Sequence, residues 1–452
     1  MSHQYFLSLP PLAAVLSELT LPRPSTEQMI SSTLSLFCRD SVSHRCHIGN
    51  ACFSLCLEQT DYPVFGLFRA VSKVLTVTSC CIRATSSENT NRVCGKGRRR
   101  ENKKMKALVF NGPRDIRFET YPDPSLKTEN SVILNVERCS ICGSDLHMYH
   151  GDNLGTASYS DGVKPFCVGH EFAGEVVEVG KQVHRFKVGD KVLASGGAPC
   201  GECSYCLSGH AQLCSGWTAF GLSTGLNGGQ AEYVNVPMAD LTLQPIPEGI
   251  SPEQSILLTD AMCTAYFGLT RTGLLPGESV AVVGLGPIGL IGVELAFILG
   301  ASEVFAIDPV ANRRSHAAGL GATALDPAQA LPIIMDRTKG AGVPRVFEAS
   351  GAKAAVELAI KIAGRGSTAS FIGLPQPDVQ LPMLKVLFKD ITIRAGVASV
   401  IDQWPHLIPL LQHGRLKAEG LFSHTMDLSE GAEAYRLFDA REDNVVKIMM
   451  NV

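Results

Sequence analysis

The sequence predicts an α/β protein of two domains, a β-rich part followed by a doubly wound parallel sheet. Between about residues 105 and 250, short alternating stretches are separated by Gly, Pro and Asp turns, which is typical of strands. From about Ser251, apolar strands alternate with helical segments, and this alternation predicts a parallel sheet with helices on both faces. The length of 452 residues exceeds what one hydrophobic core usually serves, which also favours two domains.

The individual strands follow from apolar, β-branched runs bounded by turn residues. The predicted strands of the first part are Met105–Phe110, Ser131–Val136, Glu175–Val179, Lys191–Ala194 and Ala231–Val236. Those of the second part are Ser279–Val283, Glu303–Ile307, Pro344–Glu348 and Thr368–Ile372. Near the end of the chain, Ser429 is a candidate helix N-cap, and Val445–Met449 is expected to return to the first domain as a strand.

Composition and charge narrow the class of protein. A hydrophobic content of 45% with 18% charged residues describes a soluble globular protein, and no apolar run is long enough to span a membrane. Residues 1–104 hold 13 Lys and Arg against 7 Asp and Glu, so the remaining chain carries a net charge of −9. An acidic main body argues against nucleic acid as a partner.

Residues 1–104 differ from the rest of the chain. They lack a clear helical or strand period, and we expect a disordered or non-native extension there. The opening apolar stretch contains two prolines and has no basic residue before it, which argues against a secretory signal. The expected location is the cytoplasm, with a mitochondrial presequence as the alternative if this extension belongs to the mature protein.

Four cysteines with the spacing Cys-x2-Cys-x2-Cys-x7-Cys predict a metal site. They are Cys200, Cys203, Cys206 and Cys214. Four thiolates on one short loop suit tetrahedral Zn²⁺ with no open position, which is the arrangement of a structural site. An iron–sulfur cluster is the alternative, but nothing else in the chain points to electron transfer. Metal spacing also favours a reducing compartment over a disulfide framework.

A second metal site is predicted from residues that lie far apart. His170 stands in Val168–Gly180, where glycines on both sides suggest a ligand held on tightly packed backbone at the start of a strand. Cys142 and Asp260 are the other two candidate ligands. Three protein ligands leave a fourth position for water or substrate, as in catalytic zinc. Taken singly, a core thiol and a helix N-cap are commoner roles for Cys142 and Asp260, but the combination favours the metal site.

Side chains next to these ligands are candidates for catalysis. Glu171 would lie beside the metal, where it would either exchange onto it or remain behind the ligands, and Asp145 would accept the second ring proton of His170. Ser144 and His147 would carry the proton of an alcohol toward solvent.

A glycine-rich turn predicts a dinucleotide site in the second domain. It joins an apolar strand to a helix predicted over Leu290–Leu299. The glycines allow a tight turn, close approach of a pyrophosphate and packing of the helix on the strand. The predicted coenzyme-binding residues of this turn are Gly284, Gly286, Pro287, Ile288 and Gly289.

The choice of coenzyme depends on the residues after the next strand. Asp308 follows the last glycine of the turn by 19 residues, where a carboxylate would accept a hydrogen bond from the adenosine ribose. Such a carboxylate repels a 2′-phosphate, so NAD is favoured. Arg313 and Arg314 keep NADP as the alternative and make Arg313 a candidate binding residue.

Together these motifs resemble the zinc-containing medium-chain alcohol dehydrogenases, and they occur in that family's order over about residues 105–452. The matching patterns are Cys142-Gly-Ser-Asp-Leu-His147, Gly169-His-Glu-x2-Gly-x5-Gly180, the four-cysteine loop and the glycine turn. The resemblance implies a GroES-like catalytic domain, a Rossmann coenzyme domain and NAD(P)-dependent oxidation of alcohols by homodimers or homotetramers.

The resemblance also assigns roles and boundaries. It maps the catalytic zinc ligands to Cys142, His170 and Asp260, the adjacent glutamate to Glu171, and the proton relay to Ser144 and His147. Many animal and plant members have cysteine where this chain has Asp260. The implied domains are a first catalytic part over 105–260 with a structural zinc lobe at 196–216, a Rossmann domain over 261–395 and a C-terminal return over 396–452.

The leading hypothesis is therefore a zinc-dependent alcohol dehydrogenase that prefers NAD and carries one catalytic and one structural zinc. Its substrate would be a small alcohol or aldehyde. Polyol (sorbitol-type) and L-threonine dehydrogenases are the alternatives, since they share these motifs. A catalytically silent nucleotide-binding protein is a distant alternative, because such a relative is expected to have lost at least one of Cys142, His170 and Asp260.

Overall fold

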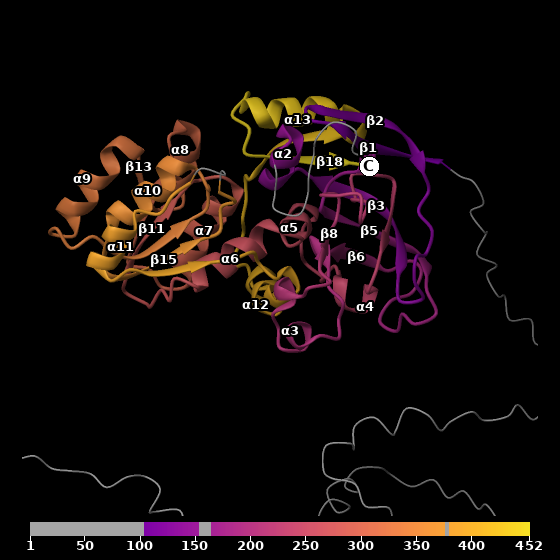
Figure 1. The fold of residues 1–452 in the computed structure, drawn as a ribbon, viewed down its shortest axis with the longest axis horizontal. Coiled ribbons are helices and arrows are strands. Elements are labelled where there is room, and N and C mark those ends of the chain that lie inside the picture. The colour runs from indigo at the N-terminus through magenta and orange to yellow at the C-terminus, as the bar shows by residue number, and fades with distance from the viewer. Residues whose placement is uncertain (1–103, 153–163, 376–378) are drawn as a thin grey trace, which may run out of the picture. The chain divides into compact units, whose positions relative to one another are not determined.

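The β-rich part and the alternating part of the chain form separate sheets in the computed structural model (Figure 1). The structure describes residues 104–152, 164–375 and 379–452, which all fall within one compact unit, Val93–Val452. The prediction for residues 1–104 lies outside the described residues, apart from Lys104, which begins the first strand. None of the helices among the described residues is long and apolar enough to cross a membrane.

Two antiparallel-rich sheets build the first part of the fold. The smaller sheet has the order β2-β1-β4, and the larger one has the order β10-β6-β5-β3-β18-β17, with β9 also paired to β3. The smaller sheet contains β1 (Lys104–Gly112), β2 (Asp115–Pro122) and β4 (Phe166–Cys167). The larger sheet contains β3 (Val132–Ser140), β5 (Glu171–Val179), β6 (Lys191–Ala194), β9 (Tyr233–Val236), β10 (Leu243–Pro245), β17 (Phe422–Asp427) and β18 (Lys447–Asn451).

The C-terminal strand confirms the predicted return to the first sheet. β18 pairs antiparallel with β3, so that Met449 lies opposite Ser140. The candidate N-cap Ser429 is wrong, because it lies inside a short 3-10 turn over Leu428–Glu430. Asp427 caps that turn in a reciprocal pair with Glu430, and α13 (Gly431–Ala440) begins only afterwards.

The second part forms the predicted parallel sheet. Its order is β13-β12-β11-β14-β15-β16, and every pairing in it is parallel. In chain order this is 3-2-1-4-5-6, the strand order of the Rossmann fold, with the switch point between β11 and β14. The strands are β11 (Ser279–Val283), β12 (Glu303–Ile307), β13 (Thr323–Leu325), β14 (Val343–Glu348), β15 (Ala363–Phe371) and β16 (Thr392–Ala395).

Helices cover both faces of this sheet because its strands are apolar on both sides. In β11, Val280 and Val282 belong to one hydrophobic cluster, whereas Ala281 and Val283 belong to another. This is the two-residue alternation of a strand that is buried on both faces. The helices of this region are α5 (Pro252–Leu257), α6 (Ala261–Thr270), α7 (Pro287–Ile298), α8 (Ala311–Gly319), α9 (Pro327–Arg337), α10 (Lys353–Ile362), α11 (Met383–Lys389) and α12 (Val400–Gln412).

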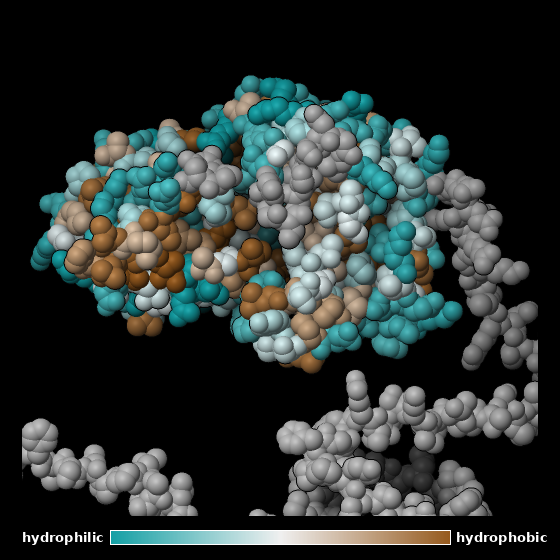
Figure 2. All heavy atoms as spheres, viewed as in Figure 1, coloured by the Kyte–Doolittle hydropathy of each residue, from teal (hydrophilic) through white to brown (hydrophobic). Residues whose placement is uncertain are grey.

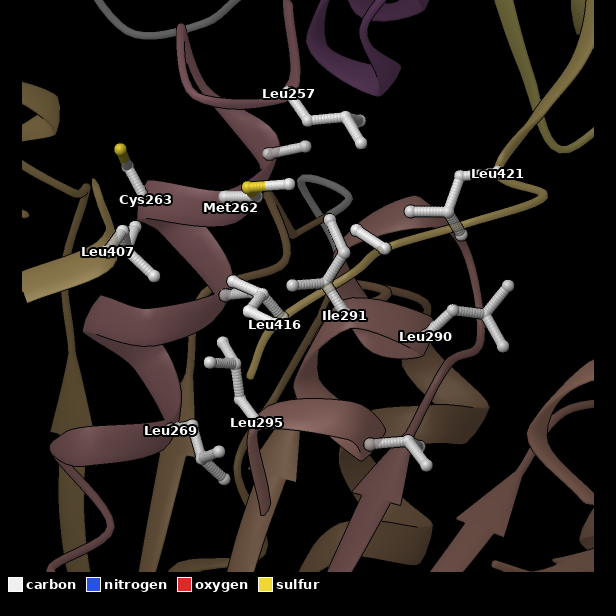
Figure 3. Close-up of a cluster of buried hydrophobic side chains, with 14 of the residues drawn as sticks. Leu257, Met262, Cys263, Leu269, Leu290, Ile291, Leu295, Leu407, Leu416 and Leu421 are labelled. Atoms are coloured by element: carbon white, nitrogen blue, oxygen red, sulfur yellow. The ribbon is translucent and has the colours of Figure 1, made fainter. Parts of the chain in front are cut away.

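The largest hydrophobic cluster lies where the two parts of the fold meet. Figure 3 shows Met262 of α6, Ile291 of α7 and Leu407 of α12 among its members. The Trp404 side chain of α12 packs into the same cluster and donates a hydrogen bond from Nε1 to the Leu258 carbonyl oxygen at 2.9 Å. Buried apolar contacts of this kind fix α6, and with it Asp260, the residue that caps the N-terminus of α6.

Candidate active site

His170 lies immediately before β5, on backbone that only glycine can precede. Gly169 has φ +90°, and a Cβ there would approach Gln230 Cγ to 2.3 Å. Gln230 is itself fixed, since Nε2 donates to the Ser140 carbonyl at 3.0 Å and Oε1 accepts from the Tyr435 hydroxyl at 3.0 Å. His170 therefore lies on tightly packed backbone at a strand start, as expected, and its role as a ligand stays a prediction.

Three predicted ligands meet in the fold and form what we call the buried cluster: Cys142, His170 and Asp260. Their donor atoms all lie within 4.8 Å of one another. Asp260 Oδ2 is 3.1 Å from Cys142 Sγ and 3.7 Å from His170 Nε2. Cys142 caps α2 (Gly143–His150) and Asp260 caps α6, so two helix starts and one strand start converge on this point.

Asp145 fixes the orientation of the imidazole. Its Oδ1 lies 3.0 Å from His170 Nδ1, and its Oδ2 accepts the Cys142 backbone N–H at 2.9 Å. Asp145 is fully buried, so both contacts are shielded from water. The second ring nitrogen, Nε2, is therefore the one that faces Cys142 and Asp260, as in metal sites whose histidine is held by a carboxylate.

The pKa shifts and the ligand types of the buried cluster are compatible with binding of a divalent cation. Burial raises the pKa of Cys142 to about 11, and the Asp260 carboxylate acts in the same direction. Burial alone would lower the pKa of His170, but Asp145, Asp260 and Cys142 raise it well above its usual value. The thiol and the imidazole thus retain protons that a divalent cation would displace. Burial would raise the pKa of Asp260, but His170 lowers it, so this carboxylate is already ionised. One thiol, one imidazole and one carboxylate, with donor atoms this close, suit zinc with a fourth position open.

Ser144 and His147 lie on α2 and line a cavity that borders the buried cluster. Ser144 Oγ is 3.2 Å from His170 Nε2, which places the hydroxyl beside the predicted metal position. His147 Nδ1 is 3.0 Å from Asp152 Oδ2, and the Asp152 side chain is 41% exposed. Ser144 thus lies at the buried cluster, whereas His147 contacts a carboxylate that is partly exposed to solvent.

Glu171 lies next to His170 in sequence, but its carboxylate contacts the side chain of Lys447. Lys447 Nζ lies 2.9 and 2.6 Å from its two oxygens and also donates to the Ile141 carbonyl at 3.2 Å. Ser140 Oγ donates to the same carboxylate. Burial would lower the pKa of Lys447, but the Glu171 carboxylate raises it, so these contacts favour an ion pair.

Lys447 is a residue that sequence reasoning missed. It is only 1% exposed and lies on β18, inside the apolar strand predicted at the C-terminus. A lysine within a run of Val, Ile and Met is the available signal, because a buried ammonium requires a partner.

The four-cysteine loop brings its predicted ligands together as well. Cys203 Sγ lies 3.4 Å from Cys206 Sγ, which in turn lies 3.9 Å from Cys200 Sγ. Cys214 Sγ accepts the Cys200 backbone N–H at 3.3 Å. Thiolates about 2.3 Å from a tetrahedral zinc are about 3.8 Å apart, which these distances match. The loop contains the short helix α3 (Ser204–Leu207) and connects β7 (Gly197–Ala198) to β8 (Thr218–Ala219), which pair antiparallel.

The glycine turn has the geometry of a dinucleotide site. A Cβ at Gly289 would lie 1.8 Å from the Gly284 carbonyl oxygen, so this glycine is required for α7 to pack on β11. A Cβ at Gly286 would contact no protein atom within 4 Å, so the space above it is free. Pro287 occupies the first turn of α7, whose N-terminus faces that space.

Asp308 lies at the end of β12 beside this turn. Its Oδ2 accepts the Leu285 N–H at 2.7 Å and its Oδ1 accepts the Val310 N–H at 2.8 Å. Arg313 and Asp308 line one cavity next to the glycine turn. Burial lowers the pKa of Arg313, and the Asp308 carboxylate opposes that effect. Arg314 points elsewhere, since its Nη1 donates to the Asp308 carbonyl and contacts Asp326 at 3.2 Å.

Two neighbouring cavities meet at the buried cluster. One, of about 640 Å³, is lined by Ser144, His147 and all three members of the buried cluster. The other, of about 500 Å³, is lined by the glycine turn, Asp308 and Arg313. Both contain Cys142 and Ile288 in their walls. A substrate in the first cavity and a dinucleotide in the second would therefore lie side by side.

Comparison with known proteins agrees with this arrangement. Residues 128–248 match the alcohol dehydrogenase GroES-like domain, and residues 287–413 match the zinc-binding dehydrogenase domain. The chain is 39% identical over 350 residues to the "Probable zinc-binding alcohol dehydrogenase" of Mycobacterium tuberculosis, covering 76% of this chain and 88% of that protein. It is 33% identical to the L-threonine 3-dehydrogenase of Bacillus licheniformis, covering 74% of this chain and 95% of that protein.

A solved structure shows the same fold. The alcohol dehydrogenase TADH from Thermus sp. ATN1 superposes with a TM-score of 0.71 at 35% identity, covering 77% of this chain and 100% of that chain. With the GroES-like and Rossmann parts both present, the sequence-based expectation of fold and family is confirmed. The chain belongs to the zinc-type medium-chain alcohol dehydrogenases, oxidoreductases that act on alcohols.

Proposed function

We propose that the buried cluster holds a catalytic zinc at which this chain oxidises an alcohol to an aldehyde or ketone, with NAD as the hydride acceptor. The observation that carries the proposal is the position of Cys142 in the walls of both cavities, with His170 and Asp260 in one of them. Polyols and L-threonine are alternative substrates, and the second is supported by the relative of that name.

Each group near the buried cluster has a part in this reaction. Zinc bound there would supply Lewis-acid activation of the alcohol oxygen. Asp145 holds the His170 ring, so that Nε2 faces the donor atoms of Cys142 and Asp260. Ser144 is close enough to accept the alcohol proton, and His147 with Asp152 provides the exit toward solvent. The bound coenzyme would accept hydride at its nicotinamide ring.

A second zinc in the four-cysteine loop completes the proposed metal content of two per chain. Its role would be structural, because four thiolates leave no open position. The proposed division of the chain keeps the catalytic part at 105–260, the coenzyme domain at 261–395 and the return at 396–452. Packing of α12 on α6 and pairing of β18 with β3 support a last segment that touches both parts.

NAD is the proposed coenzyme, with NADP as the alternative. Two backbone N–H groups anchor the Asp308 carboxylate in the second cavity, where it would meet the adenosine ribose and repel a 2′-phosphate. Asp308→Ser is expected to shift the ratio of kcat/KM for NAD over NADP by about 10- to 100-fold toward NADP. An unchanged ratio would remove Asp308 from coenzyme selection.

The proposed assembly is a homodimer or homotetramer. Figure 2 shows hydrophobic residues gathered over α11, next to the edge strand β16. Four apolar side chains on this helix are 59% to 73% exposed: Met383, Leu384, Leu387 and Phe388. Phe388→Glu is expected to halve the mass in light scattering, whereas Val188→Glu, at a similarly exposed apolar residue of the other part, should leave it unchanged.

The activity itself is tested by following NADH formation with a panel of alcohols. His170→Ala is expected to abolish alcohol-dependent NADH formation while the circular dichroism spectrum is retained. His150→Ala, which alters an exposed histidine at the end of helix α2 and outside the buried cluster, is the control and should keep nearly full activity. Undiminished activity of His170→Ala would dismiss the assignment of the site.

A further inference from the structure

The cavity in front of the buried cluster has largely apolar walls. Apart from the buried cluster, most of the side chains that line it are apolar, and they come from both parts of the fold. They include Trp217, Leu222, Ile372, Val397, Val400 and Ile401. Resting on the proposed function, we infer that the substrate is an uncharged monohydroxy alcohol with an apolar carbon skeleton, and that Trp217 is the side chain that selects it.

Charge excludes amino acids and phosphate esters as good substrates. Among the described residues that line this cavity there is no lysine or arginine, and the only carboxylate is Asp260 of the buried cluster. A substrate carboxylate or phosphate would therefore be desolvated without a lysine or arginine as its counter-ion. L-Threonine carries such a carboxylate two bonds from its alcohol carbon.

The hydroxyl groups of the lining disfavour polyols. Ser195 Oγ donates to the Gly197 carbonyl at 2.5 Å, and Thr264 Oγ1 donates to Asp260 Oδ1 at 2.8 Å. The Ser399 hydroxyl oxygen is itself buried, and among the described residues it has no partner. Ser195 and Thr264 therefore have no proton left to donate to a second or third substrate hydroxyl, and the Ser399 oxygen is covered. Such a hydroxyl would leave water for few partners on these walls, so its desolvation would be only partly offset.

Trp217 forms a fixed wall of the cavity because of the residue it packs on. It precedes β8, whose partner strand β7 begins at Gly197. A Cβ at Gly197 would come within 2.5 Å of Trp217 Cζ2 and 2.6 Å of Cε2, so the indole lies directly against this glycine. The Trp217 backbone N–H also donates to the Cys214 carbonyl at 3.0 Å, which ties the residue to the four-cysteine loop. Its position is therefore set before any substrate binds.

A carbon-matched series of alcohols tests this inference on the full zinc-loaded chain. Butan-2-ol, butane-2,3-diol and L-threonine all present a methyl carbinol on four carbons and differ only in what the rest of the molecule carries. We expect kcat/KM for butan-2-ol to exceed that for the diol by about 10- to 100-fold and that for L-threonine by about 1000-fold. Equal or better oxidation of the diol or of L-threonine would overturn the inference and leave the proposed dehydrogenase activity standing. Oxidation of none of the three, with zinc and coenzyme bound, would overturn the proposed function as well.

The role of Trp217 is tested by variants and by a readout that does not depend on turnover. Trp217→Ala is expected to lower kcat/KM for butan-2-ol by about 10-fold and to narrow the preference over the diol, whereas Trp217→Phe should retain most of both. The chain has two tryptophans, so a Trp404→Phe background makes emission report on Trp217 alone. A change in tryptophan fluorescence emission with butan-2-ol, but not with L-threonine at the same concentration, supports the inference. A change with L-threonine but not with butan-2-ol would contradict it.

Discussion

The four-cysteine loop and the buried cluster are both sets of side chains that could hold a metal ion, but they are built in opposite ways. All ligands of the loop lie between residues 200 and 214, and three of its four cysteines are only partly buried. In the buried cluster, Cys142 and Asp260 are 118 residues apart and are joined by helix starts from two different parts of the fold. The loop is closed on itself, whereas the buried cluster borders a cavity.

This difference teaches where each site should show its effect. A local loop can form with little help from the rest of the chain, so its metal should contribute to stability. An assembled cluster is positioned by the finished fold and keeps an open side, so its metal should contribute to chemistry. Variants that remove one site at a time separate these two contributions.

The largest expected effect comes from the buried cluster. Cys142→Ala should lower kcat/KM for an alcohol by about 10,000-fold or more, because it removes a ligand from the predicted catalytic metal. The midpoint of thermal unfolding should move by only a few degrees. Cys263→Ala, at a buried thiol on α6 outside the cluster, is the control and should keep activity within about threefold. Activity of Cys142→Ala within tenfold of the wild type would erase the contrast.

The next effect concerns the ion pair behind the buried cluster. Lys447→Met leaves the Glu171 carboxylate buried without its cation, which should lower the free energy of unfolding by about 3 to 5 kcal/mol. Denaturant unfolding measures this loss. Adding Glu171→Gln should recover part of the stability, because the charge then disappears with its partner. Strictly additive losses in the double variant would show that the two residues are not coupled.

A smaller effect is expected in the four-cysteine loop. Cys203→Ser should lower the midpoint of thermal unfolding by roughly 5 to 10 °C through loss of the structural metal. Because Trp217 is tied to Cys214, kcat/KM should also fall, but by no more than about tenfold. Ser204→Ala changes the neighbouring position of the same loop and is the control. A loss of activity as large as that of Cys142→Ala would remove the distinction between the two sites.

The smallest expected effect concerns the pH dependence of stability that comes from Glu348, a buried carboxylate without a cation partner in the part of the chain that the structure describes. Glu348 ends β14, and burial raises its pKa to about 7, against the Ser350 and Gly351 N–H groups that bind its Oε1. Its Oε2 has no partner among the described residues, in contrast to the carboxylate of Glu171. The native state therefore binds the proton more tightly than the unfolded chain. The stability that the protonated Glu348 gives the native state is fully present below about pH 4.5 and is lost as the pH rises to about 7.

Glu348→Gln mimics the protonated acid at every pH. Its unfolding midpoint should exceed that of the wild type at pH 8 by a few degrees, corresponding to at most about 3 kcal/mol, and the gap should close at pH 4.5. Thermal unfolding at the two pH values measures the difference. A gap that is the same at both would mean that Glu348 does not titrate in this range.

Local motifs were the most predictable part of the structure. β6, β11 and β12 begin and end at the predicted residues, because each is a short apolar run bounded by turn residues. The glycine turn was predictable for the same reason, since its spacing lies within one strand–helix connection. Ser429 failed because two residues in one turn competed as caps, and Asp427 has Glu430 three positions later to reciprocate.

Contacts across the fold were less predictable. Nothing in the sequence near His170 indicates that the neighbouring Glu171 carboxylate faces Lys447, which lies 276 residues later. The sequence motifs proposed the members of the buried cluster, but the 3.1 Å approach of Cys142 to Asp260 depends on the packing of α6 against α12. The apolar walls of the cavity in front of the buried cluster come from separate segments of the chain, so their character could not be inferred before those segments were placed.

The most direct test of this account is the zinc content of the purified full chain and two of its variants. Two zinc ions per chain are expected in the wild type, with one lost in Cys142→Ala and one in Cys203→Ser. One zinc in the wild type that Cys142→Ala retains and Cys203→Ser loses would contradict the account, because the buried cluster would then hold no metal.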